Sequence, residues 1–274
     1  QLDPHNGGLT SIQNTPFPAS GSVTDVVSNI NSNYHALTFE IQRRASKILS
    51  YDAHYTWAHA LDFNQTIGTA PSGNNWFDPL ANARSNYGNS GNDIRQRFVG
   101  WAIFNVPGIS SGSALKYVTN GWSIKPYFQM QSGLPYSLVM SGTVPNQCYV
   151  ANCLEANSSG LGGTGVTYIP QIGRNTFRNP RTMNLDLRAQ KDFNFAEKYD
   201  LQLIGEAFNL ANHQNVTGIS TTGYILNTVA PPTGSPALAT STLNYQSGFG
   251  AVTSSNSNNA YQVRQIQLAL RLVF

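Results

Sequence analysis

Along seven segments of this chain, apolar and polar residues alternate with a period of two, and each segment is roughly ten to thirteen residues long. The segments are residues 34–45, 49–60, 95–106, 122–133, 183–193, 199–210 and 263–274. Successive side chains of a β-strand point to opposite faces, so each segment would have one apolar and one polar face. A tilted strand of about this length crosses a membrane, whereas strands of soluble proteins are usually shorter. The alternation therefore predicts membrane-spanning strands.

Two segments depart from a clean alternation. In residues 95–106 we expect Val99, Trp101 and Ile103 on the apolar face, but Phe98 and Phe104 fall on the opposite face. Residues 122–133 are interrupted by Pro126, and proline has no N–H to donate to a neighbouring strand. We therefore expect a bulge or a break at that proline.

The connections between the segments alternate in length. Those after the first, third and fifth segments are the shorter ones: residues 46–48, 107–121 and 194–198. Those after the second, fourth and sixth are long: residues 61–94, 134–182 and 211–262. Outer-membrane barrels have short periplasmic turns at one end and long extracellular loops at the other. The chain is thus predicted to be an all-β, antiparallel transmembrane β-barrel segment of about seven or eight up-and-down strands. These long connections are expected to be unstructured; within them, residues 68–92 and 157–165 could bind a ligand from outside, and the simpler interpretation is mobile, solvated loop.

Composition supports this class and excludes others. Charged residues make up 11% of the chain, well below the quarter or so of an average soluble domain. No apolar run reaches the length of about 18 residues that a transmembrane helix needs. The net charge is only +3, and the basic residues are scattered, so we expect no nucleic-acid partner.

Little in the sequence points to catalysis or to a bound cofactor. Residues 108–112 (GISSG) match the nucleophile elbow formally, but the residues that follow are too few for the helix this motif requires. His54 and His59 fall on opposite faces of one segment, so they cannot chelate one metal ion together. Cys148 and Cys153 form a disulfide candidate, and two cysteines without a histidine cluster are too few for structural zinc. We expect no enzyme, no cofactor and no metal site.

Charged side chains on the polar faces are candidates for lining a barrel lumen. They are Glu40, Asp52, His54, Lys125, Asp186, Arg188, Glu206 and Arg271. Inward residues tune selectivity in such barrels, so these could line a solute path. The simpler interpretation is that they form ion pairs with one another or with a plug.

Several stretches resemble the C-terminal region of Oar-like TonB-dependent transporters. They are residues 32–37 (SNYHAL), 55–62 (YTWAHALD), 95–99 (RQRFV), 121–124 (GWSI), 131–136 (QSGLPY), 173–175 (GRN), 184–186 (NLD) and 206–213 (EAFNLANH). The resemblance implies a longer parent protein with a carboxypeptidase-regulatory-like domain, a plug and a barrel of about 22 strands, of which these would be the last. Residues 1–33 would be a loop entering the barrel, and residues 34–274 its C-terminal portion. Gln1 looks like a cut, and neither the plug nor the TonB box is present in this sequence.

The last segment carries a further expectation from outer-membrane proteins in general. Its alternating apolar residues and terminal aromatic resemble the signal that the barrel-assembly machinery reads, namely Ile266, Leu268, Leu270, Leu272 and Phe274. Such a strand can add to an exposed sheet edge through its backbone. The alternative is an ordinary hydrophobic strand.

The sequence leaves three functions open. The leading hypothesis is the barrel part of a receptor in the Gram-negative outer membrane, surrounded by lipid and taking up a bulky nutrient with energy from the TonB system. The second is a structural or adhesive outer-membrane barrel without transport. The third is a secreted soluble β-sheet protein.

Overall fold

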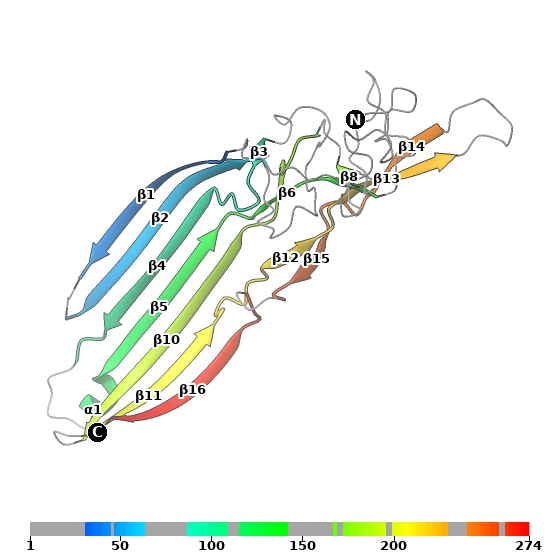
Figure 1. Ribbon diagram of the computed structural model, residues 1–274. Coiled ribbons are helices and arrows are strands. Elements are labelled where there is room, and N and C mark those ends of the chain that lie inside the picture. The colour runs from blue at the N-terminus through cyan, green and yellow to red at the C-terminus, as the bar shows by residue number, and fades with distance from the viewer. Residues whose placement is uncertain are drawn as a thin grey trace, which may run out of the picture.

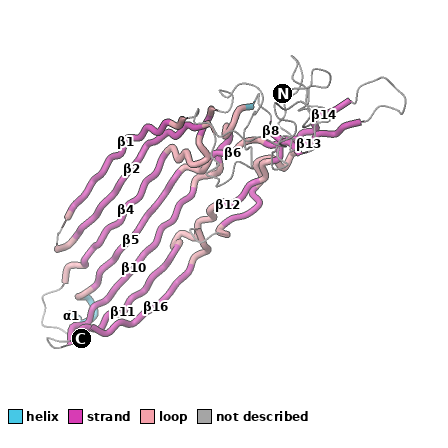
Figure 2. The backbone as a smooth tube through the Cα atoms, in the orientation of Figure 1, coloured by secondary structure: helices cyan, strands magenta, loops and turns pink. Residues whose placement is uncertain are grey.

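The computed structural model describes residues 31–44, 47–63, 87–108, 115–141, 167–168, 172–195, 199–229, 240–257 and 261–273. Within these ranges the regular structure is nearly all β-strand, with one short helix, α1 (Leu115–Thr119) (Figures 1 and 2). No helix in these ranges has the length and hydrophobicity needed to cross a membrane. Residues 1–30, 68–86 and 157–165, together with Cys148, Cys153 and Phe274, lie outside the described residues, so the expectations placed on them stay predictions.

One antiparallel sheet contains all seven predicted strands in their sequence order. They are β1 (Asn33–Arg43), β2 (Leu49–Asp62), β4 (Gln96–Asn105), β5 (Trp122–Gln131), β10 (Thr182–Phe195), β11 (Tyr199–Phe208) and β16 (Gln265–Val273). The two-residue strand β3 (Gly88–Asn89) pairs with the last two residues of β2, Leu61 and Asp62. Figure 1 shows these strands running side by side from β1 in blue to β16 in red. The up-and-down antiparallel fold predicted from the alternation is confirmed.

The strand register sorts side chains onto two faces of the sheet, because directly opposed residues point the same way. One face is apolar, and it includes the cross-strand pairs Leu37 with Trp57, Phe39 with Tyr55, Phe128 with Leu185, and Leu203 with Leu270. These side chains are not packed into a core, and Leu268 on β16 is 79% exposed. An extended exposed apolar face is what a lipid-facing wall requires.

The register corrects the expected face of β4. Trp101 lies opposite Asp52 and Tyr127, on the polar face, and Phe98 lies opposite Tyr55 and Met130, on the apolar face. Val99 and Ile103 share the side of Trp101 by the same alternation. The sequence prediction was therefore inverted for this strand, because hydrogen bonds to its neighbours fix the register and three apolar residues face the polar side.

Pro126 neither breaks β5 nor shifts its register. It lies opposite Leu187 of β10 in an unbroken ladder. On the other side, the pairing of β5 with β4 is interrupted between Tyr127 and Ile124 and resumes in the same register. The lost proline N–H accounts for this gap.

Charged side chains also occur on the apolar face at the short-connection end, where Arg43 lies opposite Tyr51 and Lys191 lies opposite Trp122. Lys191 of β10 is only 3% exposed, and its Nζ donates a hydrogen bond to the carbonyl oxygen of Asn120. The same nitrogen lies 5.9 Å from the ring centre of Trp122 and 5.0 Å from that of Phe193. A cation among interfacial aromatics and a backbone carbonyl fits the membrane boundary.

Parts of the long connections fold into β-structure, which corrects the expectation that they are unstructured. A four-stranded sheet has the order β14 (Thr240–Tyr245), β13 (Thr222–Val229), β7 (Val139–Ser141) and β8 (Thr167–Tyr168). Two further pairs join β6 (Pro135–Tyr136) to β9 (Phe177–Arg178) and β12 (Val216–Ile219) to β15 (Val252–Ser255). Leu138 and Met140 form a small buried core there, with Phe177, Tyr224 and Phe249 packed against it. These contacts give the connections a small core outside the seven long strands.

The main sheet is open within the described residues. β1 pairs with β2 alone, and β16 pairs with β11 alone, so each of these outer strands has one unpaired edge among the described residues. Figure 1 shows β1 and β16 at opposite margins of the sheet. An open edge presents unpaired backbone groups, which a membrane does not tolerate.

Candidate functional site

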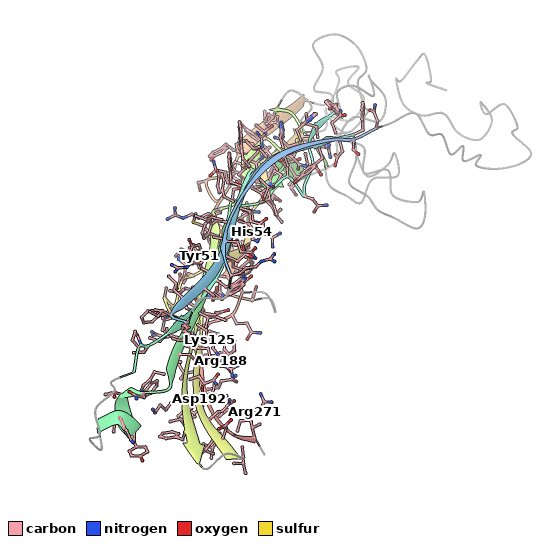
Figure 3. All side chains as sticks on the ribbon, turned by 90° about the vertical axis from the view of Figure 1, so that its left-hand side faces the viewer. Tyr51, His54, Lys125, Arg188, Asp192 and Arg271 are labelled. Carbon is pink, nitrogen blue, oxygen red and sulfur yellow. The ribbon has the colours of Figure 1, made fainter. Side chains whose placement is uncertain are left out.

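All eight predicted lumen candidates lie on the polar face of the sheet. Glu40 is opposite His54, Lys125 is opposite Arg188, and Arg188 is opposite Glu206 in the register of adjacent strands. Asp52, Asp186 and Arg271 fall on the same side by alternation. In the edge-on view of Figure 3, Tyr51 points to one side of the sheet and His54 and Arg271 point to the other. His59 is on the apolar face, as predicted from its spacing to His54.

The centre of the polar face holds a hydrogen-bonded network of charged side chains across β5, β10 and β11. Arg188 Nη1 lies 3.5 Å from Glu206 Oε1, and Lys125 Nζ donates to Gln190 Oε1 at 2.9 Å. Gln190 also accepts a bond from Arg188 Nη2 at 3.2 Å and donates to Asp192 Oδ1 at 2.7 Å. Two cations and two carboxylates thus balance around one buried amide.

A pocket of about 360 Å³ opens beside this network. Its charged lining comes from Lys125, Asp186, Arg188 and Glu206, four of the predicted lumen candidates. Its aromatic lining comes from Trp101, Tyr127 and Phe208. Rings beside convergent charged groups suit a polar solute that also has apolar faces.

The alternation pattern did not predict the aromatic part of this pocket. Trp101 was expected on the opposite face, so it was not grouped with Lys125 or Arg188. The signal that could have corrected this was the presence of both Phe98 and Phe104 at the alternate positions. Two phenylalanines argue for a lipid-facing side at least as strongly as Val99 and Ile103 do.

Asp186 and Arg271 differ from the other candidates. The Asp186 carboxylate accepts hydrogen bonds of 2.8 Å from Asn184 Nδ2 and from the backbone N–H of Asn209, so it positions the chain after β11. Asn209 has a φ of 49°, a left-handed conformation that asparagine tolerates better than most residues. Arg271 lies on the outer strand β16, opposite Gln202.

A second group of candidates gathers on β1 and β2. His54 Nε2 lies 3.0 Å from Asp52 Oδ1, and His54 Nδ1 lies 4.0 Å from Glu40 Oε2. One ligand atom from each of the three residues lies within 4.8 Å of the others. An imidazole and two carboxylates at this spacing are suited to a divalent cation, and they equally form an ion-pair cluster. The expectation of no metal site stays a prediction.

At the long-connection end, Asp93 is a buried acceptor that the sequence analysis did not single out. It is 0% exposed, and it accepts a backbone hydrogen bond from Ala60 at 2.7 Å and one from Arg95 Nε at 2.7 Å. Arg178 Nη2 also donates to this carboxylate. Burial acts to raise the pKa of Asp93, but the bonds from Ala60, Arg95 and Arg178 outweigh it, and the pKa is lowered. Asp93 thereby ties β2 to the connection that carries β9.

The predicted assembly signal keeps its alternation in the structure. Ile266, Leu268, Leu270 and Leu272 lie on the apolar face of β16, all more than half exposed. The free edge of this strand is compatible with recognition by backbone pairing. Recognition by the barrel-assembly machinery itself stays a prediction.

Comparison with protein-family models matches residues 1–267 to the outer membrane beta barrel domain. Comparisons with curated proteins and with solved structures found no match.

Proposed function

The chain belongs to the outer membrane beta barrel domain family, and from this we propose that it forms the C-terminal barrel wall of a TonB-dependent receptor for a bulky nutrient. An outer-membrane barrel protein has a lipid-facing and a water-facing wall, and the two faces of the main sheet match these. This membership disfavours the secreted soluble alternative. Receptor type, Oar-like kinship and a Gram-negative source rest on the sequence resemblance.

The observation that carries the proposal is the segregation of charge across the sheet. All eight charged candidates lie on one face, and four of them line a pocket with three aromatic side chains. A barrel that served only as an anchor would need a solvated inner wall but no such pocket. In the proposal this face lines the solute path, and the upstream region supplies the plug and the contact with TonB. The proposal includes no enzyme activity and no cofactor.

Growth and uptake in the source bacterium test the proposal. A strain lacking the gene, complemented with the wild-type gene, is grown on bulky carbon and metal sources that diffuse poorly through general porins. Growth that requires both this gene and TonB is expected. Restoration of growth in a strain without TonB would contradict energy-coupled uptake.

Two matched variants locate the solute path. Arg188→Gln removes a charge from the pocket lining. Arg97→Gln, on β4, removes a charge from the same face of the sheet but outside that lining. We expect uptake to fall for Arg188→Gln and to stay near wild type for Arg97→Gln. Equal uptake by both variants, at equal protein levels in the membrane, would exclude this pocket from the path.

A structural or adhesive role is the second candidate, and one observation favours it. The four-stranded sheet formed by β14, β13, β7 and β8 lies at the long-connection end and has its own small core. A folded element outside the membrane strands could contact a surface or a partner. Loss of surface attachment in the deletion strain, with unchanged growth on every source, would favour this role over transport.

A further inference from the structure

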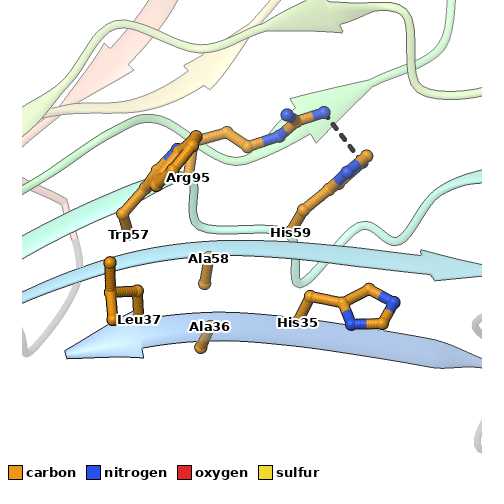
Figure 4. Close-up of a pocket in the computed structure, with 7 residues that line it drawn as sticks. All are labelled: His35, Ala36, Leu37, Trp57, Ala58, His59 and Arg95. Atoms are coloured by element: carbon orange, nitrogen blue, oxygen red, sulfur yellow. Dashed lines mark hydrogen bonds between the residues drawn. The ribbon is translucent and has the colours of Figure 1, made fainter.

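A second pocket, of about 380 Å³, lies on the apolar face of β1 and β2 (Figure 4). Its walls are two cross-strand pairs, His35 with His59 and Leu37 with Trp57. The intervening side chains, Ala36 and Ala58, belong to the other face by alternation, so the pocket floor is backbone. Leu37 is 50% exposed and Trp57 is 58% exposed, which leaves the apolar wall open to whatever surrounds the barrel.

The pocket has a polar end and an apolar end, ordered along the membrane normal. β1 starts at the long-connection end, so the histidine pair lies nearer that end than Leu37 and Trp57 do. The next pair on the same face towards the short turns is Phe39 with Tyr55. Because long loops face the outside, the polar end lies towards the outer leaflet. An amphiphile with its headgroup towards the outer leaflet would place polar groups at the polar end of the pocket and its apolar chain at the apolar end.

Arg95 supplies positive charge at the polar end. Its Nη2 lies 2.8 Å from His59 Nε2 and donates to Asn89 Oδ1 at 3.1 Å. A guanidinium only donates, so His59 Nε2 is the acceptor in the contact with Arg95, whereas the same nitrogen lies 3.1 Å from Asn89 Oδ1 and can donate to it in the other tautomer. Figure 4 shows the contact between Arg95 and His59 above the strands.

The buried Asp93 does not cancel this charge. It is shared between Arg95 and Arg178, so two guanidinium groups and one carboxylate leave a formal charge of +1. A buried, fully satisfied carboxylate also holds Arg95 in place. Arg95 Nε and Nη2 are already directed at Asp93, His59 and Asn89, so a phosphate would be met by Arg95 Nη1 in a charge-assisted contact.

We propose that this pocket binds a phosphorylated lipid of the outer leaflet. The phosphate would lie against Arg95, His59 and His35, and an acyl chain would run down past Leu37 and Trp57 towards Phe39. Charge complementarity selects an anionic headgroup, and the exposed apolar wall below it selects a lipid over a soluble phosphate. The proposal concerns the outside of the barrel, so it holds with or without transport through the inside.

Lipid retention by the whole protein tests the proposal. The protein is reconstituted in bilayers of phosphatidylcholine with and without phosphatidic acid of the same acyl chains, and retained lipids are counted by native mass spectrometry. We expect one phosphatidic acid to be retained preferentially, and Arg95→Gln to weaken its retention about tenfold, the loss of one charge-assisted phosphate contact. Arg97 of β4 lies opposite Thr56 on the polar face, so Arg97→Gln removes the same charge outside the pocket and should leave retention unchanged.

Two further arms keep the test decisive. Because Arg95 also holds Asp93, His35→Leu serves as a variant that leaves that network intact, and it should weaken retention about threefold, the loss of one neutral hydrogen bond. Inorganic phosphate added to the bilayers that contain phosphatidic acid should not displace the retained lipid. The proposal would be overturned if wild type, Arg95→Gln and Arg97→Gln retained the lipid equally, or if inorganic phosphate displaced it completely. It would also be overturned if the protein were recovered as a dimer without retained lipid.

Discussion

A single arginine placed on either face of β16 should reveal which face meets lipid. β16 has nine residues, and with a rise of about 3.3 Å and a tilt of about 40° it spans about 23 Å along the membrane normal. Leu268 is one position from the central Ala269, so its side chain lies within about 2.5 Å of the midplane. At 79% exposure, Leu268 has little packing to lose. Leu268→Arg should therefore cost the transfer penalty of an arginine at mid-membrane, about 2–4 kcal/mol.

The matched control is Gln267→Arg, one position away at nearly the same depth. Gln267 is on the polar face and donates to Glu206 Oε2, so an arginine there keeps a carboxylate partner. The free energy of unfolding of Gln267→Arg should stay within about 0.5 kcal/mol of the wild-type value.

Reversible urea titration of the whole protein in phosphatidylcholine vesicles, followed by tryptophan fluorescence, measures both variants. A difference of about 2–4 kcal/mol corresponds to a ratio of about 30 to 700 between their folding equilibrium constants. Equal destabilisation by the two substitutions, or a larger loss for Gln267→Arg, would refute the assignment of the faces.

Two other predictions concern the buried carboxylate and the open edges. Asp93→Asn should lower the free energy of unfolding by about 3 kcal/mol, because it leaves Arg95 and Arg178 without their shared anion, and urea titration measures this. Folding lowers the pKa of Asp93, so the contribution of this carboxylate to the free energy of unfolding is full above the unfolded carboxyl pKa and is lost as pH falls through the folded pKa. Wild type should therefore lose this contribution on acidification, whereas Asp93→Asn should not. These 274 residues on their own should give no steady single-channel conductance in planar bilayers, because β1 and β16 each have an unpaired edge in the part of the chain that the structure describes. A stable unitary conductance would contradict that expectation.

The local pattern of alternation predicts the face on which a candidate residue lies, but not its contacts. Glu40, Asp52 and His54 were grouped correctly because alternation alone decides which side of a strand a residue takes. Their mutual contacts, and those of Arg188 with Glu206, depend on which residues lie opposite each other, and this follows from register. Asp93 and Arg178 are far apart in the sequence and have no local pattern, so only the folded connection brings them together.

The sequence by itself determined the strands, their order and two chemically distinct faces, because a period of two is a local property that each segment carries independently. The tertiary structure decided the face of β4, the continuity of β5 through Pro126, the small core around Met140 and both pockets. These depend on cross-strand register and on contacts between distant segments. Hydrogen bonds between neighbouring strands fix a register that no single strand encodes. A shift of this register by one residue would turn Trp101 from the polar pocket to the lipid-facing side.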